Sequence, residues 1–239
     1  MAEKDHLPDK GIDKSVAEFL ERAKAVPVPA TRGEPRGRLL FAMDATASRE
    51  PAWDKAARIQ GEMFRAAEAV GELGVQLAFY RGFDEFKVSR WIMDAAEMTR
   101  LMSTVICLAG ETQIRKTLRH AVNETQTTRI NALVFVGDAC EEDIDHVAQA
   151  AGELGLLGVP AFMFHEGHDP AAEFAFREIA KLTRGAYVRF DAGSAAALRD
   201  LLSAVAVFAA GGLGALARLA LAKGGETLAI ARQMSGAKD

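Results

Sequence analysis

The stretch that decides the fold is Arg38-Leu-Leu-Phe-Ala-Met-Asp-Ala-Thr-Ala-Ser48, in which an apolar run leads directly into one carboxylate and two hydroxyls. Residues 38–44 have the length and composition of a buried strand. Asp44, Thr46 and Ser48 then follow at alternate positions, and alternate side chains of an extended chain point the same way. In a loop that curls over the end of the strand, their three oxygens can converge on one point.

This oxygen-rich loop has two interpretations. Oxygen donors without sulfur or imidazole suit Mg²⁺, Mn²⁺ or Ca²⁺ rather than zinc or copper, which makes the loop a candidate metal site. Alternatively, Thr46 and Ser48 only cap the helix that follows, and Asp44 lies at a turn. The five residues from Asp44 to Ser48 do not decide between these alternatives.

The composition is that of an ordinary globular protein. The chain has 239 residues, of which 49% are hydrophobic and 26% are charged, enough for one α/β domain with appendages. Its net charge of −4 provides no broad basic field to attract nucleic acid. The two cysteines, Cys107 and Cys140, are too few for a disulfide scaffold. We therefore expect a reduced, cytoplasmic protein.

Two segments were considered as targeting or membrane segments. The first residues of the chain are too polar for a signal peptide. Residues 201–217 lack charge but fall just short of the length that spans a bilayer. We expect a packed amphipathic helix there, broken at Gly211-Gly212, and no membrane span.

Strand and helix patterns alternate after residue 38. Strand patterns cover 38–44, 75–80, 85–92, 131–137, 160–164 and 186–190, and helical patterns cover 51–73, 94–108, 113–123, 141–155, 170–183 and 195–210. The continuous apolar run of 131–137 is typical of a strand buried on both faces, as in a parallel sheet. This order predicts an α/β fold: a doubly wound, mostly parallel six-stranded sheet with one antiparallel edge strand and helices on both faces.

The same patterns predict three segments. Residues 1–37 form an N-terminal extension, partly disordered, with a short helix near 15–25 that opens on a capping box. Residues 38–210 form the α/β domain. Residues 211–239 form a C-terminal helical extension, which either packs back on the domain or offers an apolar face to a partner.

Further oxygen donors belong at the same edge of the predicted sheet. In an open parallel sheet, ligands bind beyond the carboxyl ends of the strands, where the strand order reverses. Thr112 lies in a loop that opens a helix, and Asp138 follows strand 131–137. The candidate site then consists of Asp44, Thr46, Ser48, Thr112 and Asp138. Their formal charge of −2 would balance one divalent cation.

This pattern resembles the von Willebrand factor A (VWA) domain family and its metal-ion-dependent adhesion site. That site is a D-x-S-x-S motif after the first strand, a Thr in a later loop and an Asp after the fourth strand. The corresponding stretches here are Asp44-Ala-Thr46-Ala-Ser48, Gly110-Glu-Thr112 and Val136-Gly-Asp138. The resemblance covers residues 38–210. It departs at Thr46, which carries an added methyl group, and at Ala139, where many members have Gly.

The resemblance implies a role for each residue. Thr46 and Ser48 would bind Mg²⁺ (or Mn²⁺, with Ca²⁺ possible) directly, Asp44 and Asp138 mainly through water, and Thr112 directly or through water. One coordination position stays open, which in family members an acidic side chain of a partner often fills. Neutral hydroxyl ligands also leave the cation more electrophilic than carboxylates would.

We therefore expect a cytoplasmic, non-enzymatic interaction module that docks an acidic group of an unknown protein partner on the metal. Two alternatives stay open. One is a metal-assisted phosphate-ester hydrolase, which needs a general base such as His165, His168 or Glu141. The other is a scaffold with an empty site, whose C-terminal helices carry the interaction.

Two glycine motifs have simpler interpretations. Residues 110–117 resemble a phosphate-binding loop, but Arg115 replaces the glycine that allows backbone amides to surround phosphate. Residues 212–217 imitate a dinucleotide fingerprint, but too little chain follows for the βαβ unit that should accompany it. Neither motif predicts a nucleotide site.

Two polar motifs are also assigned local roles. His165-Glu-Gly-His168-Asp169 is expected to be a solvated loop whose Asp169 caps helix 170–183, although its groups could border the metal face. Glu141-Glu142-Asp143 is expected to form the acidic first turn of its own helix, where the helix dipole favours negative charge.

Overall fold

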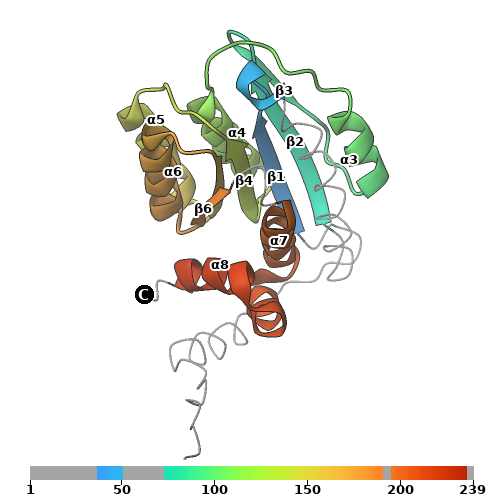
Figure 1. Ribbon diagram of the computed structural model, residues 1–239. Helices are drawn as coiled ribbons and strands as arrows, with labels where there is room; N and C mark the ends of the chain where they lie inside the picture. The colour runs from blue at the N-terminus through green and yellow to red at the C-terminus, as the bar shows by residue number, and fades with distance from the viewer. Residues whose placement is uncertain (1–36, 51–72, 191–194, 236–239) are drawn as a thin grey trace, which may run out of the picture.

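The computed structural model describes residues 37–50, 73–190 and 195–235 (Figure 1). The strands of these ranges form one six-stranded sheet in the order β3-β2-β1-β4-β5-β6. They are β1 Gly37–Asp44, β2 Leu73–Arg81, β3 Glu85–Val88, β4 Ala132–Gly137, β5 Ala161–Glu166 and β6 Ala186–Phe190. Among them, β3 at one edge pairs antiparallel and the others pair parallel. The predicted fold class is confirmed.

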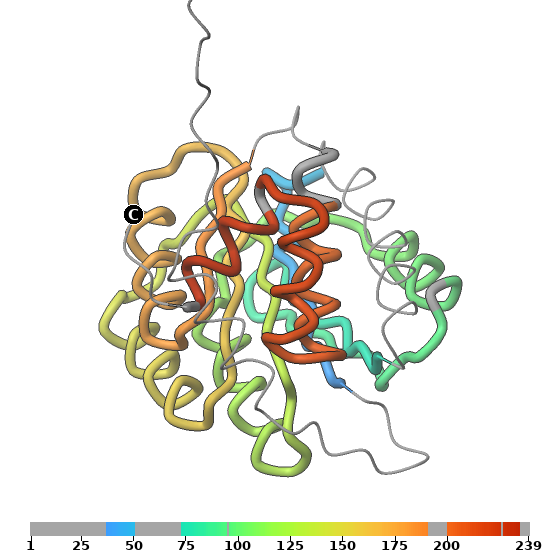
Figure 2. The backbone as a smooth tube through the Cα atoms, turned by 90° about the horizontal axis from the view of Figure 1, so that it is seen from below, coloured from blue at the N-terminus to red at the C-terminus, as the bar shows by residue number. Residues whose placement is uncertain are grey.

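Helices cover both faces of this sheet (Figures 1 and 2). They are α3 Ala95–Met102, α4 Ile114–Thr127, α5 Ile144–Leu156, α6 Pro170–Thr183, α7 Ala195–Lys223 and α8 Gly225–Ser235. One hydrophobic core lies between the sheet and α4, α5 and α6. The other lies between the opposite face and α3, α7 and α8.

The first apolar run forms the central strand β1. It pairs with β2 on one side and with β4 on the other, and alternate side chains enter the two cores. Leu39, Leu40, Phe41 and Met43 are at most 1% exposed. Each such side chain contributes about 1.5–3 kcal/mol by leaving water, so burial on both faces fixes this strand at the centre. Its carboxyl end places Asp44 where the strand order reverses.

Several boundaries differ from the sequence prediction. The strand predicted over 85–92 ends at Val88, and Ile92 forms only an isolated bridge with Val75. The helix predicted over 94–108 ends at Met102. The hydroxyls of Ser103 and Thr104 donate to backbone carbonyls of the last helical turn, and such local bonds compete with continuation of a helix.

The C-terminal helices form one packed unit. The predicted break is present inside α7: Gly212 has non-helical backbone angles, with φ of 68° and ψ of −171°, and a kink there separates the element into two helical halves. Helix α8 packs against α7 and the edge strand β6. There the Gln233 side chain accepts the Tyr187 N–H at 2.9 Å and donates to its carbonyl at 3.2 Å. Gln233 therefore covers part of the free edge of the sheet.

Helix α7 contains a 24-residue apolar segment, Asp200–Lys223, which by length and composition alone could cross a membrane. This exceeds the length that we predicted. In the structure 56% of its most apolar window is buried, and α7 packs on β1, β2 and β4. That is the behaviour of a core helix. The helices predicted near 15–25 and over 51–73 lie outside the described residues.

Candidate metal centre

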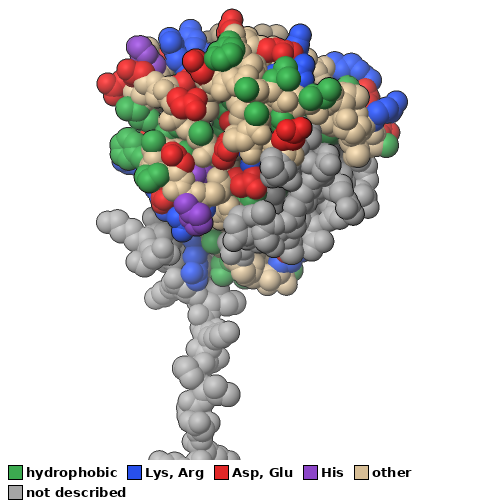
Figure 3. Space-filling model, turned by 45° about the horizontal axis from the view of Figure 1, so that its top comes forward, with side chains coloured by type: hydrophobic (Ala, Val, Ile, Leu, Met, Phe, Trp, Pro, Cys, Tyr) green, Lys and Arg blue, Asp and Glu red, His purple; other side chains and the backbone are tan. Residues whose placement is uncertain are grey.

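The predicted site residues all lie at the carboxyl edge of the sheet, around the switch point between β1 and β4. Asp44 ends β1 and Asp138 follows β4, while Thr112 precedes α4. Figure 3 turns this edge toward the viewer, and Asp and Glu side chains are spread over it with Lys and Arg between them. The site itself is built mainly from buried groups.

Asp44 is fully buried and both of its oxygens are hydrogen-bonded. Oδ1 accepts the Thr46 N–H at 2.7 Å, and Oδ2 accepts the Tyr80 hydroxyl at 3.1 Å. Burial raises the pKa of Asp44, the bonds from Thr46 oppose this shift, and the charge of Asp138 adds to it. Burial and the Asp44 charge also raise the pKa of Tyr80 well above its ordinary value, so Tyr80 stays a donor. Asp44 is thereby positioned to act on an ion through water.

Thr46 and Ser48 bring their hydroxyls together. Thr46 precedes a short 3-10 turn, η1 Ala47–Arg49, but its side chain makes no capping hydrogen bond there. Its Oγ1 instead lies 3.1 Å from Ser48 Oγ. Neighbouring ligands of an octahedral Mg²⁺, each about 2.1 Å from the ion, are about 3 Å apart. The spacing of this pair therefore suits two direct ligands. The helix that these residues would cap in the alternative interpretation, predicted over 51–73, lies outside the described residues.

Thr112 is held by the loop after β4. Its Oγ1 accepts the Glu141 N–H at 3.1 Å, and its own N–H donates to the Glu141 carboxylate at 3.2 Å. Thr112 is 6% exposed, so these two bonds fix its hydroxyl inside the site.

We predicted that Glu141 and Glu142 form the first turn of their own helix, and this prediction is wrong. Helix α5 begins at Ile144, and Asp143 is its N-cap. The Glu142 carboxylate instead accepts the N–H groups of Ile114, in a short contact, and Arg115, at 3.0 Å. The side chain of the α4 N-cap residue, Gln113, makes no capping hydrogen bond, so the free amides at the start of α4 and the positive end of the helix dipole attract this carboxylate from another loop.

Asp138 carries an oxygen with no partner. Its Oδ1 is buried and has no hydrogen-bond donor among the described residues. A Cβ on the preceding Gly137 would lie only 2.8 Å from the Phe135 ring of the same strand and 3.5 Å, an ordinary contact distance, from the Asp44 Cβ. Buried polar atoms of folded proteins nearly always have a partner, so a cation would explain this one.

These donors fit a divalent cation. Two carboxylates and three hydroxyls are hard oxygen ligands, and the carboxylates together balance its charge. Within residues 37–50, 73–190 and 195–235, no group of three or more His, Cys, Asp or Glu side chains could hold a metal ion. Any ion at this edge therefore depends on the hydroxyls of Thr46, Ser48 and Thr112.

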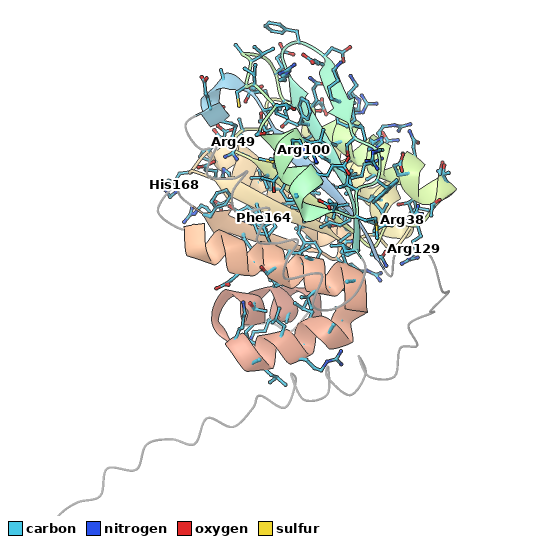
Figure 4. All side chains as sticks on the ribbon, turned by 90° about the vertical axis from the view of Figure 1, so that its right-hand side faces the viewer. Arg38, Arg49, Arg100, Arg129, Phe164 and His168 are labelled. Atoms are coloured by element: carbon cyan, nitrogen blue, oxygen red, sulfur yellow. The ribbon has the colours of Figure 1, made fainter. Side chains whose placement is uncertain are left out.

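Sequence reasoning missed Arg49. Its side chain is 1% exposed and its Nη1 forms an ion pair with Glu166 at the end of β5. Burial lowers the pKa of Arg49, while the charges of Asp138 and Asp44 oppose that shift. The only signal in the sequence was its place directly after Ser48. Figure 4 shows Arg49 at the same end of the sheet as His168.

The two histidines of the β5 segment lie in different surroundings. We predicted that His165 lies in a solvated loop, but strand β5 extends to Glu166 and His165 is buried. Its Nδ1 lies 3.0 Å from the Tyr187 hydroxyl. Burial lowers the pKa of His165, and the backbone of Asp138 opposes the shift. His168 is exposed. Asp169 caps α6 as predicted, accepting the Ala172 N–H at 2.6 Å.

Comparisons with known proteins bear on the fold. No protein-family model matches the chain, and no curated protein matches it. Solved structures do match. A von Willebrand factor type A protein from Catenulispora acidiphila superposes with a TM-score of 0.57 at 15% identity, over 70% of this chain and 42% of that one. This chain therefore spans less than half of that relative.

Two further structures agree over nearly their whole length. The SpRpn10 VWA domain has a TM-score of 0.56 at 12% identity, covering 68% of this chain and 94% of its own. The fold is that of a VWA domain. An aerotolerance-related membrane protein from Bacteroides fragilis, with multiple mutations to serines, has a TM-score of 0.55 at 15% identity, covering 70% and 96%. The predicted resemblance to VWA domains is confirmed for the fold.

Proposed function

We propose that this VWA-fold protein is a metal-dependent interaction module of the cytoplasm. It binds Mg²⁺, or Mn²⁺ or Ca²⁺ in its place, and docks an acidic side chain of a protein partner on the ion. The metal-binding residues of the proposal are Asp44, Thr46, Ser48, Thr112 and Asp138. The observation that carries it is the buried Oδ1 of Asp138, which has no hydrogen-bond donor among the described residues and whose carboxylate charge acts on Asp44.

The arrangement of the donors supports docking. When bound, the ion would supply an electrophilic position for a carboxylate of the partner. Thr46 and Ser48 offer paired hydroxyls, and Asp44 has both oxygens engaged by Thr46 and Tyr80. Asp44 therefore orients water rather than binding the ion itself.

Hydrolysis is the weaker alternative because two of the three candidate bases are already engaged in hydrogen bonds. His165 is fully buried and bonded to Tyr187. The Glu141 carboxylate is bonded to the backbone of Thr112. His168 is exposed on the loop after β5, with no bond to a site residue. We expect no turnover of p-nitrophenyl phosphate with Mg²⁺, and turnover lost in His168→Gln would instead favour the hydrolase.

Thermal unfolding with and without divalent ions tests the proposal. An ion present at 100 times its dissociation constant stabilises the fold by about 2.7 kcal/mol. For a chain of this size that corresponds to a rise in Tm of about 5–11 °C. We expect this rise in the wild type but not in Asp138→Asn. The control Asp94→Asn removes a carboxylate that caps α3 and should retain the metal-dependent rise in Tm.

Capture of binding proteins from a lysate, with and without EDTA, then tests the docking step. Binding partners should be lost both in EDTA and in Asp138→Asn, and retained in Asp94→Asn. A wild type without any metal-dependent rise in Tm, or an equal rise in Asp138→Asn, would contradict the metal site.

A further inference from the structure

Arg49 is an unusual buried cation. It is the largest side chain that is fully buried in the described part of the chain. None of its three guanidinium nitrogens has a hydrogen bond with acceptable geometry to a described residue, despite the charge contact with Glu166. Buried arginines are normally paired and hydrogen-bonded, because desolvating their charge is costly. The charges around it must therefore account for its position.

Three carboxylates from three neighbouring strands supply these charges. Glu166 at the end of β5 contacts the guanidinium directly. The charges of Asp138 and Asp44, from the ends of β4 and β1, also act on it. Without Arg49 the cluster would carry a formal charge of −3 in a water-poor setting. The guanidinium thus lies where a metal ion would be attracted for the same reason.

We propose that Arg49 is the resident cation of this site, and that a divalent ion binds by displacing its guanidinium from Asp44 and Asp138. The inference rests on the proposed metal-binding function. An arginine stays charged in proteins and its planar fork suits paired carboxylate acceptors, yet here it makes no hydrogen bond of good geometry. A compact ion with twice the charge and hydroxyl ligands at hand is a better match for the same carboxylates.

The position of Arg49 allows this exchange. It is the last residue of η1, and its neighbours Ser48 and Glu50 are exposed. A change in the side-chain torsions of Arg49 would move the guanidinium away without disturbing β1 or Ser48. Since the ion competes with a charge that is part of the chain, its apparent affinity is reduced by the fraction of molecules in which Arg49 occupies the site. Arg49 therefore sets the metal concentration at which the module becomes able to dock a partner.

Titration of Mg²⁺ by calorimetry and by Tm, in wild type, Arg49→Gln and Arg49→Lys, tests the inference. We expect Arg49→Gln to bind Mg²⁺ about tenfold or more tightly, because the competing charge is gone. Arg49→Lys keeps the charge and should stay near the wild type. The control Arg38→Gln removes a charge at the opposite end of β1 and should leave the affinity unchanged (Figure 4).

A chemical competition gives a second measurement. In the smaller variant Arg49→Ala, millimolar methylguanidinium should raise the Mg²⁺ concentration at half-saturation, whereas NaCl at equal ionic strength should not. If Arg49→Gln does not fold alone, Mg²⁺ should restore its folding by supplying the missing charge. Failure of Mg²⁺, at about 100 times the dissociation constant measured for the wild type, to restore it would overturn the inference.

The outcomes separate the two proposals. Equal Mg²⁺ affinity in wild type and Arg49→Gln overturns the role of Arg49 and leaves the metal site standing. Absence of binding in both proteins overturns both. Binding by Arg49→Gln with none by the wild type supports Arg49 as the resident cation but contradicts the proposal that the wild-type protein binds the ion and docks a partner on it.

Discussion

Removal of one hydroxyl tests how the Asp44 carboxylate is held. In Tyr80→Phe, Oδ2 of Asp44 loses its only donor among the described residues, at 3.1 Å, while the ring keeps its stacked contact with Phe135 at 6.2 Å between centroids. A hydrogen bond to a charged group contributes about 1.5–3 kcal/mol. Because the change is otherwise isosteric, we expect that loss in the free energy of unfolding, or about 3–12 °C in Tm.

Tyr187→Phe is the matched control. Its hydroxyl lies 3.0 Å from Nδ1 of His165, whose pKa is lowered by burial, so the bond joins two neutral groups at neutral pH. Such a bond contributes about 0.5–1.5 kcal/mol. Urea unfolding of both variants in EDTA at pH 7.5 measures the difference. The reasoning is refuted if Tyr80→Phe costs no more than Tyr187→Phe.

Three further predictions concern the scaffold. Burial lowers the pKa of His120 below its ordinary 6.5, so the unfolded chain binds the proton first as pH falls. Stability should therefore decline below about pH 6.5, and less steeply in His120→Gln. Gln233→Leu removes both bonds to the edge of β6 and should cost roughly 1–3 kcal/mol and promote self-association. Gly185→Ala places a Cβ 1.9 Å from a carbonyl of β5 and should cost at least about 1–3 kcal/mol, whereas Gly152→Ala, inside α5 with open space around it, should stabilise by about 0.5–1 kcal/mol.

Urea unfolding across pH 5–8 and size-exclusion chromatography check these three predictions. An unchanged slope in His120→Gln would mean that the pKa of His120 is the same in the folded and unfolded chain. A monomeric, fully stable Gln233→Leu would mean that α8 shields the edge without this side chain. Equal effects at Gly185 and Gly152 would contradict the close approach of β5.

The sheet could be predicted because the sequence of each central strand is sufficient to identify it as a strand. Strands β1 and β4 are buried on both faces, so each reads as an unbroken apolar run. Asp169 and Pro170 likewise announce the start of α6, and its predicted range agrees with the structure. The order of these patterns then fixes which strand ends share an edge, and so places Asp44 and Asp138 together.

The remaining features depend on contacts between distant segments. The sequence around Glu142 predicts that it belongs to its own helix, but its carboxylate accepts backbone amides at the start of α4. That contact exists only because the fold brings the two loops together. Arg49 reads as a surface residue after the motif, yet the fold encloses it among carboxylates of three strands. The end of α3 depends on local hydrogen bonds of the Ser103 and Thr104 hydroxyls. The spacing of apolar residues, from which the helix was predicted, carries no information about these bonds.

The bonds between Glu141, Glu142 and the start of α4 also reduce the number of independently moving parts around the site. Thr112 and Asp138 belong to one rigid unit, because the loop that follows Asp138 is hydrogen-bonded to the segment that carries Thr112 and begins α4. The loop after β1, which carries Arg49, is a second unit. A ligand that moves either the Thr112 segment or the loop after Asp138 would therefore move the other with it, and α4 and α5, which follow these loops and pack against each other, would respond together.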